Sequence, residues 1–72
     1  MYWKLNTPVC TFIIAAKGNG FALYADSEFL QSASTADALA DNVYTHTSEF
    51  PEWDMSEYEV EDSLSAWELL KI

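Results

Sequence analysis

The sequence predicts an α+β fold: a small antiparallel β-meander of three to five strands, with one principal helix packed on one face. Three observations carry this prediction. Residues 11–25 alternate around Gly18-Asn19-Gly20, residues 34–48 change to a helical period, and residues 57–62 alternate again. Such changes of hydrophobic period are the main signal of secondary structure in a single sequence.

The stretch from Thr11 to Ala25 has the pattern of a β-hairpin. Its two-residue turn is either Gly18-Asn19 or Asn19-Gly20, because these residues tolerate positive φ, and both choices give the same pairing parity. The pairing places five apolar side chains on one face: Phe12, Ile14, Ala16, Phe21 and Leu23. A second turn at Asp26-Ser27 extends the hairpin into a meander. It would pair Leu23 with Leu30 and Tyr24 with Phe29.

The opposite face of this meander is also apolar, since it carries Ile13, Ala15, Tyr24 and Phe29. So much apolar surface is not left wholly in water. Either the terminal segments cover it or another subunit does. We expect self-association, most simply a homodimer, through Ile13, Tyr24 and Phe29.

A helix is predicted at about residues 35–47, capped by Ser34 or Thr35, with Asp37 in its first turn. Its apolar stripe is made of Ala36, Leu39, Ala40, Val43 and Thr47. That stripe fits the face of the meander that carries Phe12. The helix is expected to end near Thr47 or Ser48.

The rest of the chain is less regular. We expect a short strand at Tyr2–Leu5, and we expect Phe50 to fold back onto the core before Pro51 stops regular structure. Residues 57–62 alternate strictly and predict a half-buried strand with an acidic outer face. Residues 64–72 fit either a helix or a strand, and we favour a short turn followed by a final strand.

The length of 72 residues bounds the chain to one domain, residues 1–72. Half of the residues are hydrophobic, which indicates a folded core. No stretch approaches the roughly 20 apolar residues needed to span a bilayer, and the N-terminal residues do not resemble a signal peptide. The single cysteine, Cys10, cannot form an internal disulfide. We therefore expect a cytoplasmic protein.

Charge is the unusual feature of the composition. Twelve acidic residues against three lysines and no arginine give a net charge of −9. All twelve acids lie from Asp26 to Glu68, and no base lies between them. Nucleic acid backbones and anionic membranes attract cationic proteins, so direct binding to either is not expected.

No residue pattern points to catalysis, a metal or a cofactor. His46 is the only histidine, and a metal site needs three or four convergent ligands. We interpret it as a helix-end residue. Cys10 lacks the cations that would activate a thiol, so we interpret it as a buried hydrophobic residue. We expect no enzymatic activity and no cofactor.

The C-terminal half suggests a different role. Its carboxylates and aromatic side chains predict one negative partner-binding surface: Glu52, Trp53, Asp54, Glu57, Glu59, Glu61 and Asp62, with Trp53 as an aromatic anchor at its edge. Such a surface suits a basic protein partner, including a nucleic-acid-binding protein, because carboxylates can stand in for phosphates. Inhibitors of phage or mobile-element type have this composition. The alternative is a structural protein that acts mainly through self-association.

Overall fold

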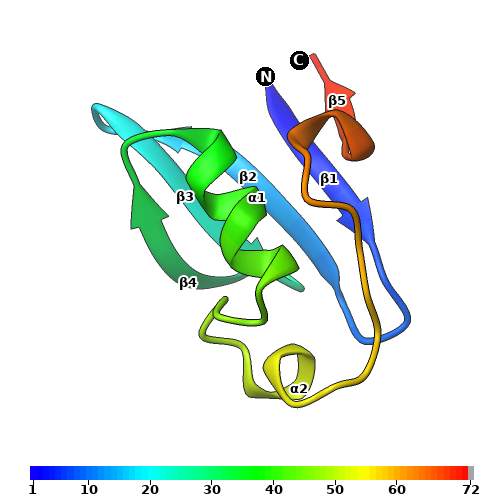
Figure 1. Ribbon diagram of the computed structural model, residues 1–72. Coiled ribbons are helices and arrows are strands. Elements are labelled where there is room, and N and C mark those ends of the chain that lie inside the picture. The colour runs from blue at the N-terminus through cyan, green and yellow to red at the C-terminus, as the bar shows by residue number, and fades with distance from the viewer. Residues whose placement is uncertain (72) are drawn as a thin grey trace.

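The computed structural model describes residues 1–71 and contains a five-stranded antiparallel sheet with one main helix across one face (Figure 1). In chain order the elements are β1 (Tyr2–Asn6), β2 (Thr11–Lys17), β3 (Gly20–Ala25), β4 (Glu28–Ala33), α1 (Ala36–Tyr44), α2 (Pro51–Asp54), the 3-10 helix η1 (Leu64–Ala66) and β5 (Glu68–Leu70). The strands lie in the order β4-β3-β2-β1-β5. The predicted α+β class is confirmed.

The β2–β3 hairpin has its turn at Gly18-Asn19, because Lys17 pairs with Gly20. Gly18 has φ of 61°, as the first turn residue of a type II′ hairpin requires. Gly20 is needed for a different reason. A Cβ at this position would lie 2.5 Å from the backbone oxygen of Ala33, so only glycine lets the end of β4 come this close.

The second turn lies at Asp26-Ser27, as predicted. Both residues have positive φ, 48° and 74°, which is the pattern of a type I′ turn. This turn brings Tyr24 opposite Phe29, and their rings meet edge to face with centroids 5.9 Å apart. The predicted Tyr24–Phe29 pair is confirmed.

A β-bulge in β4 makes the other predicted pair wrong. Leu23 lies opposite Gln31 and not Leu30, because Leu30 is the extra residue of the bulge. From this position the side chain of Gln31 accepts a hydrogen bond from Asn42 Nδ2 at 2.6 Å and donates one to the backbone oxygen of Thr47 at 3.0 Å. The bulge therefore ties β4 to the end of α1.

Helix α1 is capped by Thr35, whose hydroxyl accepts a hydrogen bond from the backbone N–H of Ala38 at 3.2 Å. Its buried residues are Ala36, Leu39, Ala40 and Val43. They form one core cluster with Phe12, Ile14 and Leu23 of the sheet, as the predicted stripe requires. The core therefore lies between α1 and one face of the sheet.

The helix ends at Tyr44, earlier than predicted. His46 has φ of 60°, a conformation that an α-helix does not accommodate, so the chain turns away at this point. Thr47, predicted on the apolar stripe, lies beyond the helix and is exposed.

Two predictions for the following segment are wrong. Pro51 begins α2 instead of stopping regular structure, because proline suits the first position of a helix. Residues 57–62 have an irregular backbone and do not form the predicted strand. The sheet edge beside β1 is already occupied by β5, so this segment has no strand there to pair with. Phe50 does pack against the core, as predicted.

The C-terminal prediction is confirmed in its preferred form. A single turn, η1, precedes the short strand β5, which pairs with β1. Figure 1 shows η1 on the same side of the sheet as α1, and Leu64 and Trp67 both join the core there. Ile72, the last residue of the predicted strand, lies outside the described residues.

Candidate protein-interaction surface

The charges divide cleanly between the two layers of the fold. The sheet and its turns, residues 1–33 and 68–71, carry three lysines and three carboxylates, so they have no net charge. Residues 34–67, which we call the acidic layer, carry nine carboxylates and no lysine: Asp37, Asp41, Glu49, Glu52, Asp54, Glu57, Glu59, Glu61 and Asp62. The whole net charge of −9 therefore belongs to the layer that covers one face of the sheet.

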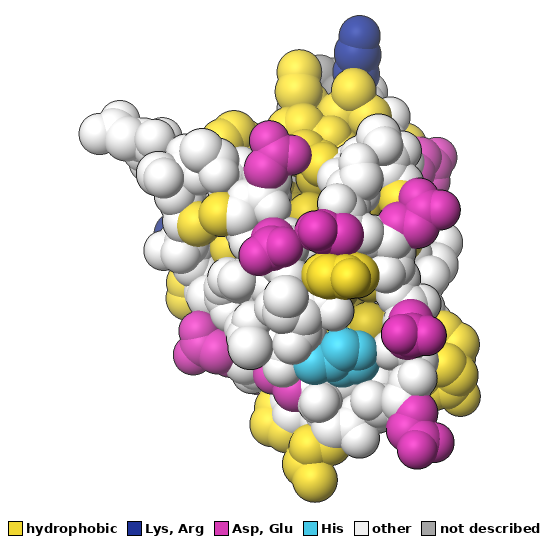
Figure 2. Space-filling model, in the orientation of Figure 1, with side chains coloured by type: hydrophobic (Ala, Val, Ile, Leu, Met, Phe, Trp, Pro, Cys, Tyr) yellow, Lys and Arg dark blue, Asp and Glu magenta, His cyan; other side chains and the backbone are white. Residues whose placement is uncertain are grey.

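Figure 2 shows this side of the molecule. Acidic side chains, in magenta, are spread across it, and lysine side chains, in dark blue, appear only at its margin. Charges of one sign on one side create a directed field that attracts cations and cationic proteins.

The connecting segment, residues 55–63, carries four of these nine charges. The side chains of Glu57, Glu59, Glu61 and Asp62 are all exposed. Because the backbone here is irregular, they do not form the regular row that a strand would give. The four carboxylates lie within six consecutive residues of the chain.

His46 holds the connecting segment in place. Its ring stacks on the indole of Trp53, with centroids 4.8 Å apart and an interplanar angle of 4°. Its Nδ1 lies 2.9 Å from the backbone oxygen of Trp53, and its Nε2 lies 2.8 Å from that of Tyr58. A neutral imidazole can donate only one of these two hydrogen bonds, whereas an imidazolium donates both. The His46 ring thus links α2 to the connecting segment.

Asp54, a predicted site residue, forms hydrogen bonds within its own chain. Its Oδ1 accepts hydrogen bonds from the backbone N–H and the hydroxyl of Ser48, at 3.0 and 2.8 Å. Its Oδ2 accepts one from the backbone N–H of Glu49 at 3.0 Å. This carboxylate is half-buried and closes the loop before α2, so most of its hydrogen-bonding capacity is already used.

The proposed anchor role of Trp53 is wrong. Its side chain is 0% exposed. The indole packs edge to face on Phe12, with centroids 5.6 Å apart, and its Nε1 donates to the backbone oxygen of Val43 at 2.8 Å. A residue enclosed in this way builds the core and cannot reach a partner.

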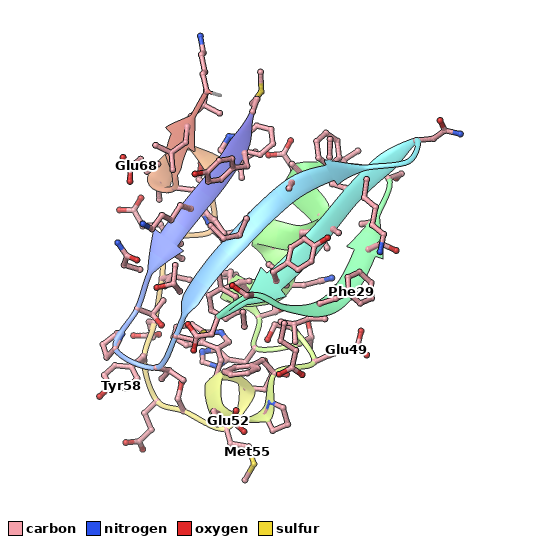
Figure 3. All side chains as sticks on the ribbon, turned by 180° about the vertical axis from the view of Figure 1, so that it is seen from behind. Phe29, Glu49, Glu52, Met55, Tyr58 and Glu68 are labelled. Carbon is pink, nitrogen blue, oxygen red and sulfur yellow. The ribbon has the colours of Figure 1, made fainter. Side chains whose placement is uncertain are left out.

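The acidic layer instead exposes three other large side chains, namely Tyr44, Met55 and Tyr58. Met55 is 86% exposed and follows directly after α2. Figure 3 shows Glu49, Glu52, Met55 and Tyr58 projecting from the α2 end of the molecule. The sequence signal for these residues was their position between carboxylates, although the same signal also pointed to Trp53.

Two carboxylates of the acidic layer meet directly. Asp62 of the connecting segment lies against Asp41 of α1, and the hydrogen bond it shares with Asp41 raises the pKa of Asp62 above its ordinary value. Desolvation and the repulsion between the two charges act in the same direction. The acidic layer is therefore crowded enough for its charges to oppose one another.

Cys10 is buried, and burial raises the pKa of its thiol to about 11. A thiol in this state is protonated near neutral pH and is a poor nucleophile. Within residues 1–71, no group of three or more His, Cys, Asp or Glu side chains is placed to hold a metal ion. None of the helices in that range has the length and apolar character that crossing a bilayer requires.

Comparison with protein families, with curated proteins and with solved structures gives no match. We therefore infer the function from the surface itself.

Proposed function

We propose that this chain is a small non-enzymatic binding module whose acidic layer docks on a basic surface of another protein. The observation that carries the proposal is the confinement of the entire net charge of −9 to one layer. Complementary charge speeds the encounter of two proteins and selects against partners of the same sign.

The contact is centred on the connecting segment and the α2 end. Exposed carboxylates there, Glu52, Glu57 and Glu59, alternate with Met55 and Tyr58. Tyrosine and methionine are enriched in protein interfaces, where they supply apolar area between charged contacts. A cationic partner would meet both kinds of side chain on the same short stretch.

The chemistry of the partner follows from the charge. Closely placed carboxylates on a folded surface imitate a phosphate backbone, so a nucleic-acid-binding protein is the partner class that this surface suits best. In that form the chain acts as an inhibitor of phage or mobile-element type, since it occupies the site that the nucleic acid would use.

The test uses two variants that each lose two charges from the parent's −9. One carries Glu57→Gln and Glu59→Gln, in the acidic layer, and the control carries Glu28→Gln and Glu68→Gln, in the sheet layer. The immobilised chain is used to capture proteins from a cell lysate, and these are eluted with a salt gradient. Each exposed pair is worth about 0.5–1 kcal/mol, so the acidic-layer variant should bind about fivefold to thirtyfold more weakly.

The control variant should bind as the parent does. Equal weakening of both variants would show that only net charge matters. If the parent chain retains no protein from the lysate, the proposal is wrong. Addition of duplex DNA separates the two forms of the proposal. DNA should release a partner that the acidic layer binds as a nucleic-acid mimic, whereas a partner that stays bound would disprove mimicry and leave docking intact.

A further inference from the structure

The backbone of residues 57–62, within the connecting segment, is held by a single hydrogen bond in the part of the chain that the structure describes. Figure 1 shows this stretch as a loop that runs from α2 towards η1. Its one backbone hydrogen bond joins the oxygen of Tyr58 to His46 Nε2, at 2.8 Å. Val60 adds a partly buried apolar contact with the core. The order of this stretch therefore depends strongly on one imidazole.

The other ring nitrogen of His46 faces a carbonyl that already has two donors. Nδ1 lies 2.9 Å from the backbone oxygen of Trp53. That oxygen also accepts hydrogen bonds from the backbone N–H of Ser56, at 2.9 Å, and from its hydroxyl, at 2.7 Å. The side chain of Trp53 is enclosed in the core, so its backbone has little freedom to move away from the ring. Both nitrogens of His46 thus face carbonyl oxygens, which can only accept.

The number of protons on the ring decides whether both contacts can be hydrogen bonds. An imidazolium donates at both nitrogens. It also gains from the indole of Trp53, on which it stacks with centroids 4.8 Å apart, because a cation is attracted to the face of an aromatic ring. A neutral imidazole has a lone pair on one nitrogen, and this lone pair repels the carbonyl oxygen that it faces. One of the two contacts must then lengthen.

The elements that pack against the ring carry acids and phenols but no lysine. Their titratable groups are Asp41 and Tyr44 of α1, Glu49 of the loop before α2, Glu52 and Asp54 of α2, and Glu57, Tyr58, Glu59, Glu61 and Asp62 of the connecting segment. Figure 2 shows the imidazole, in cyan, at the surface with acidic side chains, in magenta, near it. Carboxyl groups ordinarily titrate near pH 4 and phenols near pH 10, so histidine is the group of this region that ordinarily titrates between them.

We infer that a proton on His46 fixes the connecting segment and that loss of this proton releases it. The released part is Tyr58 and its neighbours, because Trp53 stays in the core whereas no second hydrogen bond holds the backbone of residues 57–62. Imidazole ordinarily changes its charge between about pH 5 and about pH 8, so the segment should pass from ordered to mobile as the pH rises through this range. The inference concerns the free chain and does not rest on the proposed function.

NMR relaxation of the full chain, labelled with ¹⁵N, is the test, at a series of pH values from about 5 to about 8. The backbone order parameters of residues 57–62 should fall from about 0.85, which is typical of rigid backbone, to below about 0.6. The ¹⁵N signals of the His46 ring report its protonation over the same series, and both changes should share one midpoint. The order parameters of α1 should stay constant, because its backbone is held by its own hydrogen bonds.

Asp62 requires a matched control. Its pKa is raised by the hydrogen bond that it shares with Asp41, so its proton also favours the attachment of the connecting segment. Asp62→Asn keeps the shape of the side chain and removes this titration, and its segment should respond to pH as that of the parent does. His46→Asn removes the ring at a position with φ of 60°, which asparagine tolerates. Its segment should be mobile at every pH in the series.

A parent segment that is equally ordered throughout the series would overturn the inference. A pH response that persists in His46→Asn would do the same, because another group would then be its cause. Loss of the response in Asp62→Asn would assign it to the carboxyl pair instead. If His46→Asn does not fold, the parent and Asp62→Asn still decide the question, since different midpoints for the ring and the segment would disprove the link between them.

Discussion

At the scale of single residues, Trp53 and Trp67 are both buried, at 0% and 4% exposure, but their indole N–H groups differ. That of Trp53 donates to the backbone oxygen of Val43, whereas that of Trp67 has no hydrogen-bond partner within residues 1–71. Changing each tryptophan to phenylalanine removes similar volume. Trp53→Phe should therefore destabilise the fold by about 1 kcal/mol more than Trp67→Phe, since it alone loses a hydrogen bond.

Urea unfolding followed by circular dichroism measures the two free energies of unfolding. Equal losses of unfolding free energy would mean that the hydrogen bond of Trp53 makes no net contribution to stability. A larger loss for Trp67→Phe would contradict the prediction. The matched volumes make packing changes comparable between the two variants.

The same two residues show what a sequence can reveal at this scale. Burial of Trp67 follows from its place in an apolar stretch, but Trp53 stands among carboxylates and was predicted to be exposed. The start signal at Pro51 could have corrected this, because a short helix brings Trp53 back onto Phe12. The link that His46 makes between α2 and the connecting segment could not have been predicted. The backbone oxygens of Trp53 and Tyr58 that it meets are brought there by tertiary contacts.

At the scale of elements, Asp41 and Asp62 join α1 to the connecting segment through two groups that repel when both are charged. The raised pKa of Asp62 means that the folded state binds its proton more tightly than the unfolded state does. Its stabilising contribution is therefore present below the ordinary pKa of an aspartate and is lost as pH rises through the raised value. Asp62→Asn cannot ionise, so this variant should be more stable than the parent at pH 7.

Thermal unfolding at a series of pH values checks this expectation. The advantage of Asp62→Asn should shrink as the pH falls towards the ordinary pKa of an aspartate, because Asp62 of the parent then gains its proton. Glu59→Gln removes one charge from the same segment and should give a smaller gain at pH 7. If Asp62→Asn is no more stable than Glu59→Gln at pH 7, the contact of Asp62 with Asp41 does not lower the stability of the parent.

The hairpin and the main helix were predicted correctly because each follows from a pattern that is local in the sequence. The hairpin around Gly18-Asn19 and the α1 stripe depend on neighbours within a few residues, so period and turn residues suffice to predict them. The alternation at residues 57–62 has the same period as a strand, but joining the sheet depends on tertiary contacts, and the position beside β1 is taken by β5. The bulge at Leu30 was missed because period alone does not reveal an inserted residue.

At the scale of the whole molecule, nine carboxylates on one layer repel one another and lower the stability of the folded state. Salt screens this repulsion, since the Debye length falls from about 30 Å at 0.01 M to about 10 Å at 0.1 M. The midpoint of thermal unfolding should therefore rise over this range of sodium chloride. The variant with Glu57→Gln and Glu59→Gln has less repulsion to screen, so its midpoint should rise less steeply.

Differential scanning calorimetry at fixed pH measures both slopes. The control with Glu28→Gln and Glu68→Gln should keep nearly the slope of the parent, because its two charges belong to the neutral layer. Identical slopes for all three proteins would show that the clustering of charge on one layer has no energetic consequence.

The pairing of β1 with β5 also determines the order in which the chain can assemble. The pairings among β1 to β4 join neighbouring strands in the sequence, so only short loops must close. β5 pairs Leu70 with Tyr2, and this contact spans almost the entire chain. It carries the greatest loop-closure entropy and is held by three residue pairs, so β5 should dock last during folding and open first in the native state. When it opens, Trp67 loses its cover and β1 becomes the edge of the sheet, which makes the C-terminal strand the point where unfolding begins.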